Sequence, residues 1–466
     1  MSLYNTFTDP GAMHAVLSHR KRVFFVGIGG IGMQGLALLL AGRGFAVGGS
    51  DRVFSPGVAA LRAAGIPVAV GHREENIRGY DVLIYTLAAT GEVAELAAAR
   101  KAALPCFSRA DLLGYLMAPY PVRIGVAGIH GKSTTTAMLA DILCAAGRDP
   151  TVLSGAAMGD GNVMREGKGQ TFLCEACEYK DSFLCLSPSI AVVLNCEWEH
   201  PDYFKCPAQV KASFYTYMQR AALVILPADQ AISDLPPSDG MRVLRFGLSP
   251  ASDVRASEVA YHGGCASFTY CFCGRLRGRV RLSLPGAHNM QNALAALAVA
   301  EACHISFPAA ADALAACRGA DRRLSRRGTW QGITVYEDYA HHPTEIRASL
   351  AALREIAKEG GGAGRLICVF QLHTYSRTAA LYADFLTAFG AADYLLLLDI
   401  YAAREENESG VSAEKMAAAI PHAAYVPSFA AAAEELTRIG RPGDLLVVMG
   451  AGDVFHLFER LPCNLP

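Results

Sequence analysis

The chain lacks an excess of charge of either sign. Its 466 residues include 42 Lys and Arg and 43 Asp and Glu, so the formal net charge is −1. Proteins that bind nucleic acid or anionic membranes usually present a basic field. We therefore expect neither nucleic acid nor a membrane as a partner.

Long apolar runs are also missing. No apolar stretch reaches the length of a bilayer span without polar interruption, and Met1–Arg20 lacks a basic start followed by a long apolar segment. We therefore expect a cytoplasmic protein without an export signal or anchor. The length exceeds what one hydrophobic core usually supports, which predicts two to four domains.

The 14 cysteines lack the regular spacing of a disulfide scaffold, so we expect reduced thiols. Cys174 and Cys177 have the C-x-x-C spacing of a zinc site or a redox pair. Cys174 lies within an apolar, strand-like run, and no second C-x-x-C completes a tetrahedral set. We therefore favour a role as small buried hydrophobic residues.

The strongest chemical signal present is GIHGKSTTT at residues 128–136, which follows the apolar run IGVA. Glycines let backbone N–H groups close on phosphate oxygens, Lys132 adds positive charge, and Ser133 can reach Mg²⁺ at a helix N-terminus. The usual P-loop has glycine five residues before Gly131, where Val126 stands, so this is a shorter G-x-x-G-K-S form. It predicts a triphosphate site; the alternative is an ordinary strand-to-helix turn.

A second glycine-rich turn, GIGGIG, occupies residues 27–32 between a strand-like run and a helical run, Met33–Ala41. A further strand ends in Ser50 and Asp51, about twenty residues after the glycines, where dinucleotide-binding folds hold a ribose hydroxyl. The pattern indicates a diphosphate at a helix N-terminus without saying which nucleotide carries it. A purely structural glycine turn is the alternative.

Acidic and polar residues follow several other predicted strands. The strand candidates that begin at Phe172 and Ile190 end near Glu175 and His200. In a parallel sheet these ends share the edge that carries the phosphate loop, so both side chains are candidate ligands of Mg²⁺ or a second divalent ion. His288 and Asn292 stand one helical turn apart and could both meet a base; the alternative is a helix cap.

The last part of the chain repeats the alternation of strands and helices. A strand ends at Asp338 and a helix is expected to begin at Pro343, as the preference of proline for the first helical turn predicts. We predict an α/β protein of three domains: an N-terminal Rossmann-like domain (1–118), a central P-loop ATPase-like domain with a mostly parallel sheet (119–320), and a C-terminal Rossmann-like domain (321–466). Two nucleotide-type sites and a third domain rich in Arg and His suggest an enzyme that joins substrates at the expense of ATP.

With these motifs the chain resembles the Mur ligase family along nearly its whole length. The motifs that carry the resemblance are GIGGIGM (27–33), GIHGKSTTT (128–136), EACE (175–178), NCEWEHPD (195–202), HNMQN (288–292), DYAHHPTE (338–345), HTYSR (373–377) and GAGD (450–453). It is most similar to the members that join L-alanine to UDP-N-acetylmuramate. The resemblance implies three domains that bind UDP-N-acetylmuramate, ATP and the amino acid. It also implies an acyl-phosphate intermediate, Mg²⁺ as cofactor (possibly two ions), and a monomer or homodimer.

The resemblance also assigns site residues through the matching motifs. The implied ATP site comprises Gly128, Ile129, His130, Gly131, Lys132, Ser133 and Thr134, with His288 and Asn292 at adenine, Arg323 at the phosphates and Asp338 near the ribose. The implied UDP site comprises Gly27, Gly29, Gly30, Gly32, Ser50 and Asp51. The implied amino-acid site comprises His342, His373 and Arg377, and the implied metal ligands are Ser133, Glu175 and His200. The implied catalytic residues are Lys132, Glu175, His200 and Arg377.

The chain departs from the family pattern at three positions. Many relatives carry Asp where Cys177 and Lys180 stand, and Arg where Thr374 stands. Arg377 is then the nearer candidate for pairing with the amino-acid carboxylate. Some relatives bridge two metals with a carbamoylated lysine, and Lys211 lies near that position.

Three alternative functions stay open. A ligase that recycles a preformed peptide onto the same sugar nucleotide would need a wider amino-acid pocket. An NAD-dependent dehydrogenase would explain the first glycine turn and Asp51 but not residues 128–136. A P-loop switch protein would not need the third domain.

Overall fold

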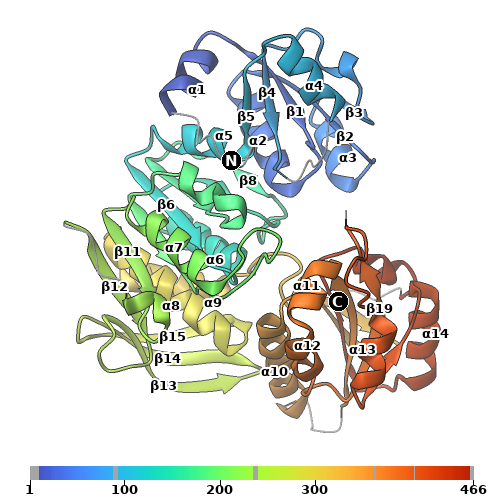
Figure 1. The fold of residues 1–466 in the computed structure, drawn as a ribbon. Coiled ribbons are helices and arrows are strands. Elements are labelled where there is room, and N and C mark those ends of the chain that lie inside the picture. Colours follow the sequence, from blue (N-terminus) through green and yellow to red (C-terminus); the bar gives the residue numbers. More distant parts are fainter. Residues whose placement is uncertain (1–9, 88–92, 235–239, 360–363, 404, 462–466) are drawn as a thin grey trace. The chain divides into compact units, whose positions relative to one another are not determined.

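The computed structural model describes residues 10–87, 93–234, 240–359, 364–403 and 405–461 (Figure 1). The chain forms two compact units. The first comprises Met1–Cys196, Lys211–Val254 and Ala295–Ala313, and the second comprises Glu197–Val210, Arg255–Leu294 and Leu314–Pro466.

The N-terminal part of the first unit contains a parallel sheet with strand order β3-β2-β1-β4-β5. Its strands are β1 (Arg22–Val26), β2 (Ala46–Asp51), β3 (Val68–Val70), β4 (Val82–Tyr85) and β5 (Cys106–Ser108). The accompanying helices are α1 (Pro10–Leu17), α2 (Ile31–Gly42), α3 (Pro56–Ala63), η1 (Glu74–Ile77), α4 (Ala94–Lys101) and α5 (Arg109–Met117). The order reverses at β1, so the turn after β1 opens at the switch point where such sheets bind nucleotides.

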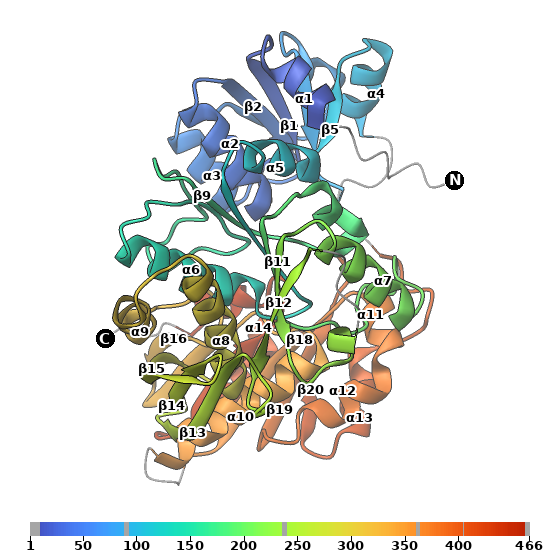
Figure 2. The same cartoon turned by 90° about the vertical axis from the view of Figure 1, so that its left-hand side faces the viewer.

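A second group of strands in the first unit has the order β12-β11-β10-β6-β9-β7-β8. Neighbouring strands pair in parallel from β12 to β7, and β8 is antiparallel to β7. These strands are β6 (Val122–Ala127), β7 (Thr151–Leu153), β8 (Met164–Arg165), β9 (Thr171–Glu175), β10 (Ile190–Val193), β11 (Leu223–Pro227) and β12 (Arg242–Gly247). Helices α6 (Lys132–Ala145) and α7 (Pro207–Met218) lie on opposite sides of β11 (Figure 2). Right-handed crossovers that run in opposite directions from β6 and β10 produce this arrangement.

Two short helical turns complete this part of the chain. They are η2 (Tyr179–Cys185), which follows β9, and η3 (Ala231–Asp234), which follows β11.

The second unit contains the antiparallel strands β14 (Cys265–Phe272) and β15 (Arg275–Pro285), preceded by β13 (Val254–His262). The buried residues of β14 and β15 include Phe268, Tyr270 and Val280. Helices α8 (Ala287–Ala302) and α9 (Phe307–Ala316) follow in sequence.

The C-terminal sheet has the order β16-β17-β21-β18-β19-β20, with only β16 antiparallel to its neighbour. Its strands are β16 (Ser325–Trp330), β17 (Ile333–Asp338), β18 (Leu366–His373), β19 (Tyr394–Tyr401), β20 (Ala423–Tyr425) and β21 (Leu445–Met449). Its helices are α10 (Pro343–Glu359), α11 (Tyr375–Ala380), α12 (Tyr382–Ala388), α13 (Ala413–Ala419), α14 (Phe429–Ile439) and η4 (Val454–Glu459).

Alternate residues of this sheet pack into two separate cores. One core joins Phe370 and Val447 to residues of α10, α12 and α13. The other joins Val369 and Val448 to residues of α14 and η4. The strand β18 is buried from Leu366 to Leu372. Because both of its faces are covered, its sequence LICVFQL is apolar except for Gln371.

This architecture confirms the predicted α/β fold class. A local prediction is also confirmed, because α10 begins at Pro343. Gly147, with φ +68°, follows the C-cap of α6. The domain boundaries at residues 118/119 and 320/321 stay predictions.

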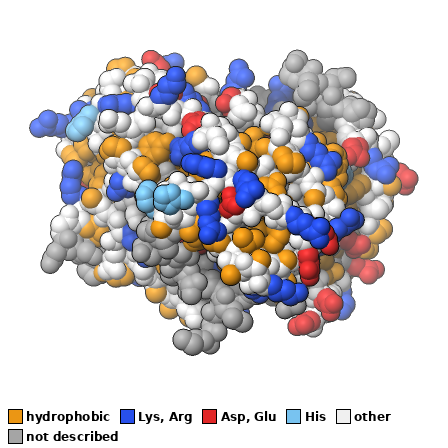
Figure 3. Space-filling view, turned by 90° about the horizontal axis from the view of Figure 1, so that it is seen from above, with side chains coloured by type: hydrophobic (Ala, Val, Ile, Leu, Met, Phe, Trp, Pro, Cys, Tyr) orange, Lys and Arg blue, Asp and Glu red, His pale blue; other side chains and the backbone are white. Residues whose placement is uncertain are grey.

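Surface features bear on the expected partners. In the described part of the chain, no helix combines the length and the apolar character that a membrane crossing requires. The absence of an export signal was expected for Met1–Arg20, of which residues 1–9 lie outside the described part of the chain. On the face seen in Figure 3, basic side chains are interspersed with acidic and apolar ones.

Candidate active site

The predicted phosphate loop joins β6 to α6 in the first unit. Gly131 is the N-cap of α6 and has φ +85°, a left-handed conformation that residues with a Cβ rarely adopt. The Asn195 side chain fastens this loop on both sides: its Oδ1 accepts from the His130 N–H at 2.9 Å, and its Nδ2 donates to the His130 carbonyl at 3.0 Å. Asn195 therefore fixes the backbone of the loop at His130, next to the N-terminus of α6, where anions are favoured.

Lys132 is paired within the same unit. Its Nζ donates to Glu178 Oε2 at 2.9 Å and to the carbonyls of Gly128 and Ile129. Burial lowers the pKa of Lys132, but Glu178 together with Cys177 and Glu175 outweighs burial and holds the pKa above its ordinary value. Lys132 is therefore a fixed positive charge at the loop, and Glu178 is a contact that the sequence reasoning missed.

A cavity of about 260 Å³ in the first unit connects the two glycine turns. Its lining includes Gly30 and Gly32 of the first turn, Lys132 of the phosphate loop, and Glu175 at the end of β9. Glu175 Oε1 accepts hydrogen bonds from Ser154 Oγ and the Gly155 N–H. The structure thus brings predicted diphosphate-binding and catalytic residues to one cavity.

Arg109 also lines this cavity, and the sequence reasoning missed it. It is the first residue of α5, and its guanidinium packs on Gly32, where a Cβ would lie 3.3 Å from Nη1. Among the described residues no carboxylate pairs with Arg109. An unpaired guanidinium beside a glycine turn is suited to a phosphate or carboxylate ligand. In the sequence, only the pair Ser108-Arg109 at the start of a helix could have indicated this role.

The first glycine turn is held by an acid. Gly27 has φ +76°, and the N–H of Gly29 donates to Asp51 Oδ2 at 2.9 Å. A Cβ on Gly29 would lie 2.8 Å from that oxygen, so glycine is required for the close approach. In this structure Asp51 supports the turn, and its predicted contact with the UDP moiety stays a prediction.

Ser50 belongs to a polar network that the sequence reasoning also missed. Its hydroxyl lies 3.3 Å from His72 Nδ1, which lies 3.1 Å from Oε2 of the fully buried Glu95. Burial raises the pKa of Glu95, but hydrogen bonds from Asn76 and Ser50 outweigh it, so the pKa lies below its ordinary value. Glu95 is therefore a buried carboxylate that orients His72 and Ser50.

The predicted metal ligands belong to different units. Ser133, in the first turn of α6, and Glu175 lie in the first unit, whereas His200 lies in the second. A serine hydroxyl and a carboxylate are the oxygen ligands that Mg²⁺ prefers, and Glu175 lies in the strand adjacent to β6. Ser133 and Glu175 therefore fit a magnesium ion, while the role of His200 stays a prediction.

In the second unit, Arg377 forms a buried ion pair. Its Nε donates to Glu199 Oε1 at 2.8 Å, and its Nη1 lies 2.9 Å from His373 Nδ1. Burial raises the pKa of Glu199, but the charge of Arg377 and the neighbouring histidines together outweigh it, and the pKa is far below its ordinary value. Arg377 is thus held in place by two neighbours, and its predicted role toward an amino-acid carboxylate stays a prediction.

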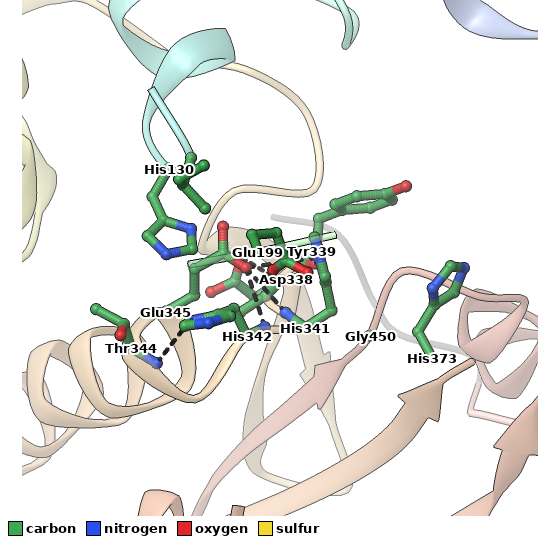
Figure 4. A network of polar contacts seen from close by, with 12 residues as sticks. His130, Glu199, Asp338, Tyr339, His341, His342, Thr344, Glu345, His373 and Gly450 are labelled. Atoms are coloured by element: carbon green, nitrogen blue, oxygen red, sulfur yellow. Dashed lines mark hydrogen bonds and ion pairs between the residues drawn. The ribbon is translucent and has the colours of Figure 1, made fainter. Parts of the chain in front are cut away.

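Figure 4 shows Glu199 of this pair together with His341, His342 and His373 of the same unit. Burial, together with the charge of Arg377, lowers the pKa of His341 to about 4 and that of His373 to about 3. Both rings are therefore neutral near pH 7 and can accept hydrogen bonds. His342 lies 3.9 Å from Glu197 Oε2, while Thr344 donates to the same oxygen.

The predicted nucleotide residues of the second unit are Arg323, Asp338, His288 and Asn292, of which only Asp338 lies in β17. Asp338 ends this strand, and burial raises its pKa to about 6 although Ser349 donates a hydrogen bond to it. Arg323 Nη1 lies 3.8 Å from Glu345. Asn292 is buried and donates to Asn289, while His288 lies in the first turn of α8. Their contacts with ATP stay predictions.

The positions that depart from the family pattern have specific environments. Cys177 lines the cavity as a free thiol, and burial raises its pKa; Cys174 is free and buried in β9. Lys180 has φ +52° and donates to the Leu87 carbonyl. Thr374 has φ +66°, which strains a β-branched residue. Lys211 lies in α7, and its carbamoylation stays a prediction.

Three family models match successive parts of the chain. The Mur ligase family catalytic domain matches residues 22–121, the Mur ligase middle domain matches residues 126–300, and the Mur ligase glutamate ligase domain matches residues 322–452.

Individual relatives match nearly the whole chain. It is 39% identical to a UDP-N-acetylmuramate–L-alanine ligase of Caldanaerobacter subterraneus, over 96% of this chain and 98% of that protein. It is 38% identical to the ligase of the same name of Geobacter sulfurreducens, over 96% and 98%. The fold resembles the solved structure of MurC from Thermotoga maritima, with a TM-score of 0.81, 24% identity and coverage of 95% and 98%. A murein peptide ligase from Psychrobacter arcticus gives a TM-score of 0.72 at 24% identity, covering 94% and 98%. The chain belongs to the Mur ligase family.

Proposed function

We propose that this chain is an ATP-dependent ligase that joins L-alanine to the lactoyl carboxylate of UDP-N-acetylmuramate, a step of peptidoglycan precursor synthesis. The relatives that match nearly its full length at 36–39% identity carry that name. The substrates are a nucleotide sugar, ATP and a free amino acid, which are consistent with a cytoplasmic enzyme.

The observation that carries the proposal is the cavity in the first unit. Gly30 and Gly32 of the first glycine turn line the same cavity as Lys132 and Glu175. A diphosphate held at the N-terminus of α2 would direct the rest of its molecule toward the phosphate loop. A ligase needs this arrangement, because the acceptor carboxylate must meet the γ-phosphate of ATP within reacting distance.

The proposed reaction has two steps. The lactoyl carboxylate attacks the γ-phosphorus of ATP, the bond to the β-phosphate oxygen breaks, and an acyl phosphate and ADP form. The amine of L-alanine then attacks the acyl carbon, and the tetrahedral intermediate expels inorganic phosphate and loses a proton. Negative charge grows on phosphoryl and acyl oxygens in both steps, so Lys132 contributes by electrostatic stabilisation.

A magnesium ion fits this chemistry. Ser133 and Glu175 would hold it, and when bound it would neutralise phosphate charge. Gly155 and Ser154 orient the Glu175 carboxylate through their hydrogen bonds. Lys132 keeps its positive charge near pH 7, because Glu178 together with Cys177 and Glu175 holds its pKa above the ordinary value although burial opposes this.

Residues of the second unit would act on the amino acid and on ATP. Arg377, held by Glu199 and His373, would pair with the carboxylate of L-alanine, and the neutral ring of His373, whose Nδ1 accepts from Arg377, would donate a hydrogen bond from Nε2 beside it. Arg323 would approach the phosphates of ATP, and Asp338 would approach its ribose. The proposed form is a monomer or homodimer.

Peptide recycling is the second candidate, because the fold also resembles a murein peptide ligase. The test is release of phosphate from Mg-ATP in the presence of UDP-N-acetylmuramate, with L-alanine, glycine, L-serine or the recycled tripeptide as acceptor. We expect release that needs both the sugar nucleotide and L-alanine and that is lost in Lys132→Ala. Preference for the tripeptide would replace the proposal by recycling, and release without the sugar nucleotide would refute both.

A further inference from the structure

The hairpin β14–β15 carries a local excess of positive charge. Residues 259–300 contain four arginines and neither Asp, Glu nor Lys, although the whole chain has a net charge of −1. The arginines occupy alternate positions of β15: Arg275, Arg277, Arg279 and Arg281. Arg279 and Arg281 pair with Thr269 and Ser267 without a register shift between them, so these two point to the same face, and all four arginines are exposed.

Protection of a sheet edge explains part of this pattern. β15 is an edge strand, and natural edge strands often carry charges that discourage pairing with another chain. Edge protection needs charge alone, however. It does not explain why some of these side chains converge on a cavity with other polar groups.

Such a cavity, of about 330 Å³, lies on the hairpin and within the second unit. Its polar lining consists of Arg279, Arg281, His262, Ser267 and Cys265, and Ala266 and Leu282 complete it. None of these residues is acidic. The hydroxyl of Ser267, which is 92% buried, accepts from Arg279 Nη2 at 3.1 Å and so fixes that guanidinium beside the cavity.

Neither guanidinium is neutralised by an acid of the described residues. Within the described residues, no carboxylate pairs with Arg279 or Arg281. The acid of the neighbouring strand, Glu258, accepts a hydrogen bond from Thr269 Oγ1 at 2.7 Å. Two uncompensated guanidinium groups, an imidazole and a buried hydroxyl match the donors that phosphate groups attract.

We propose that this cavity is a second anion site, which binds a small phosphate-bearing ligand between Arg279 and Arg281. It shares no residue with the sites assigned to ATP, the sugar nucleotide or the amino acid, so the inference does not rest on the proposed function. The ligand phosphate takes the place of the missing carboxylates, with Ser267 and His262 as further hydrogen-bonding groups.

Two cysteines of the hairpin allow a local test on the full-length protein. Cys265 lines the cavity, whereas Cys273 is exposed at the turn between β14 and β15 and is not part of the lining. The rates at which N-ethylmaleimide labels each thiol are measured by mass spectrometry with and without inorganic pyrophosphate. We expect pyrophosphate to slow the labelling of Cys265 at least threefold and to leave Cys273 unchanged. Equal rates at Cys265 with and without pyrophosphate would overturn the proposal.

Matched double variants separate the cavity from the general charge of the strand. Arg279→Ala/Arg281→Ala and Arg275→Ala/Arg277→Ala each remove two arginines from β15, but only the first pair lines the cavity. Protection of Cys265 should disappear in the first variant and persist in the second. Loss in both would show diffuse attraction by the strand and refute the site. Circular dichroism confirms that each variant is folded.

The same labelling experiment identifies the source of the phosphate. Inorganic phosphate, ADP and UMP are compared with pyrophosphate as protecting ligands. Protection by phosphate and pyrophosphate alone assigns an inorganic anion, and stronger protection by one nucleotide assigns a nucleotide. The Lys132→Ala variant should show the same protection as the wild type; if protection were lost there, the effect would come from the phosphate loop and the proposal would fail.

Discussion

Lys132 Nζ lies 2.9 Å from Glu178 Oε2, so the lysine of the phosphate loop is paired with a carboxylate of the protein itself. Only 16% of the Lys132 side chain and 2% of the Glu178 side chain are exposed. A triphosphate would bring competing negative charge to the same ammonium group. Binding of ATP therefore exchanges one partner of Lys132 for another.

This exchange predicts how Glu178→Gln behaves. Without ATP the substitution leaves Lys132 largely buried without a counter-charge, which should cost about 2 kcal/mol and lower the melting temperature by several degrees. With ATP the phosphates supply the charge, so the difference from wild type should shrink. Thermal unfolding with and without Mg-ATP measures this.

The matched control for Glu178→Gln is Glu166→Gln. Glu166 pairs with Arg43 at 2.9 Å, but both side chains are partly exposed, so the change should be below about 1 kcal/mol and independent of ATP. An equal loss of stability in Glu178→Gln with and without nucleotide would show that Lys132 keeps Glu178 as its partner.

Asn195 should be a positioning residue for ATP. Asn195→Ala removes two hydrogen bonds to His130, worth about 1 kcal/mol each, so kcat/KM for ATP should fall about 30-fold while KM for UDP-N-acetylmuramate is unchanged. Asn195→Asp, which keeps the acceptor, should recover part of the loss. The exposed Asn162→Ala is the control, and a loss confined to stability would contradict the prediction.

Arg109 should bind the sugar nucleotide. Loss of a charge-assisted hydrogen bond in Arg109→Ala should raise KM for UDP-N-acetylmuramate about 10-fold to 100-fold and leave KM for ATP unchanged. Arg109→Lys should be intermediate, since lysine keeps the charge but not the planar fork. Arg148→Ala, at an exposed arginine that donates to the Cys303 carbonyl, is the control. A rise in KM for ATP alone would remove Arg109 from the sugar-nucleotide site.

Asp338 should give the stability a defined dependence on pH. Burial raises its pKa from 3.8 to about 6 in the folded chain. The corresponding stabilisation is fully present below the unfolded pKa and is lost as the pH rises through about 6, with a maximum of about 3 kcal/mol.

Melting temperatures from pH 4 to 7 test this for wild type and Asp338→Asn. The variant has no carboxyl to ionise, so its advantage over wild type should grow as the pH rises through this window. Parallel curves would mean that Asp338 keeps an ordinary pKa.

Local patterns in the sequence predicted much of the fold. The glycine turns at residues 27–32 and 128–131 each follow a short apolar strand, and their chemistry is local, so β1, α2, β6 and α6 lie where expected. Pro343 marked the start of α10 for the same reason.

The missed parts of the site depend on contacts between distant residues. Arg377 and Glu199 are 178 positions apart, and no local pattern indicates that they form a buried pair. Arg109 was missed because its position in the cavity depends on how α5 packs beside the first glycine turn. Glu178 was recognised as an acid after a strand, but its pairing with Lys132 follows only from the adjacent strands β6 and β9.

The central claim, ligation through an acyl phosphate, has a direct isotopic test. UDP-N-acetylmuramate labelled with ¹⁸O in its lactoyl carboxylate is converted with Mg-ATP and L-alanine, and the released phosphate is analysed by mass spectrometry. Attack of the carboxylate on the γ-phosphorus predicts that one ¹⁸O atom enters each phosphate released from fully labelled substrate. Phosphate without ¹⁸O would show that the carboxylate does not attack ATP and would contradict the proposed function.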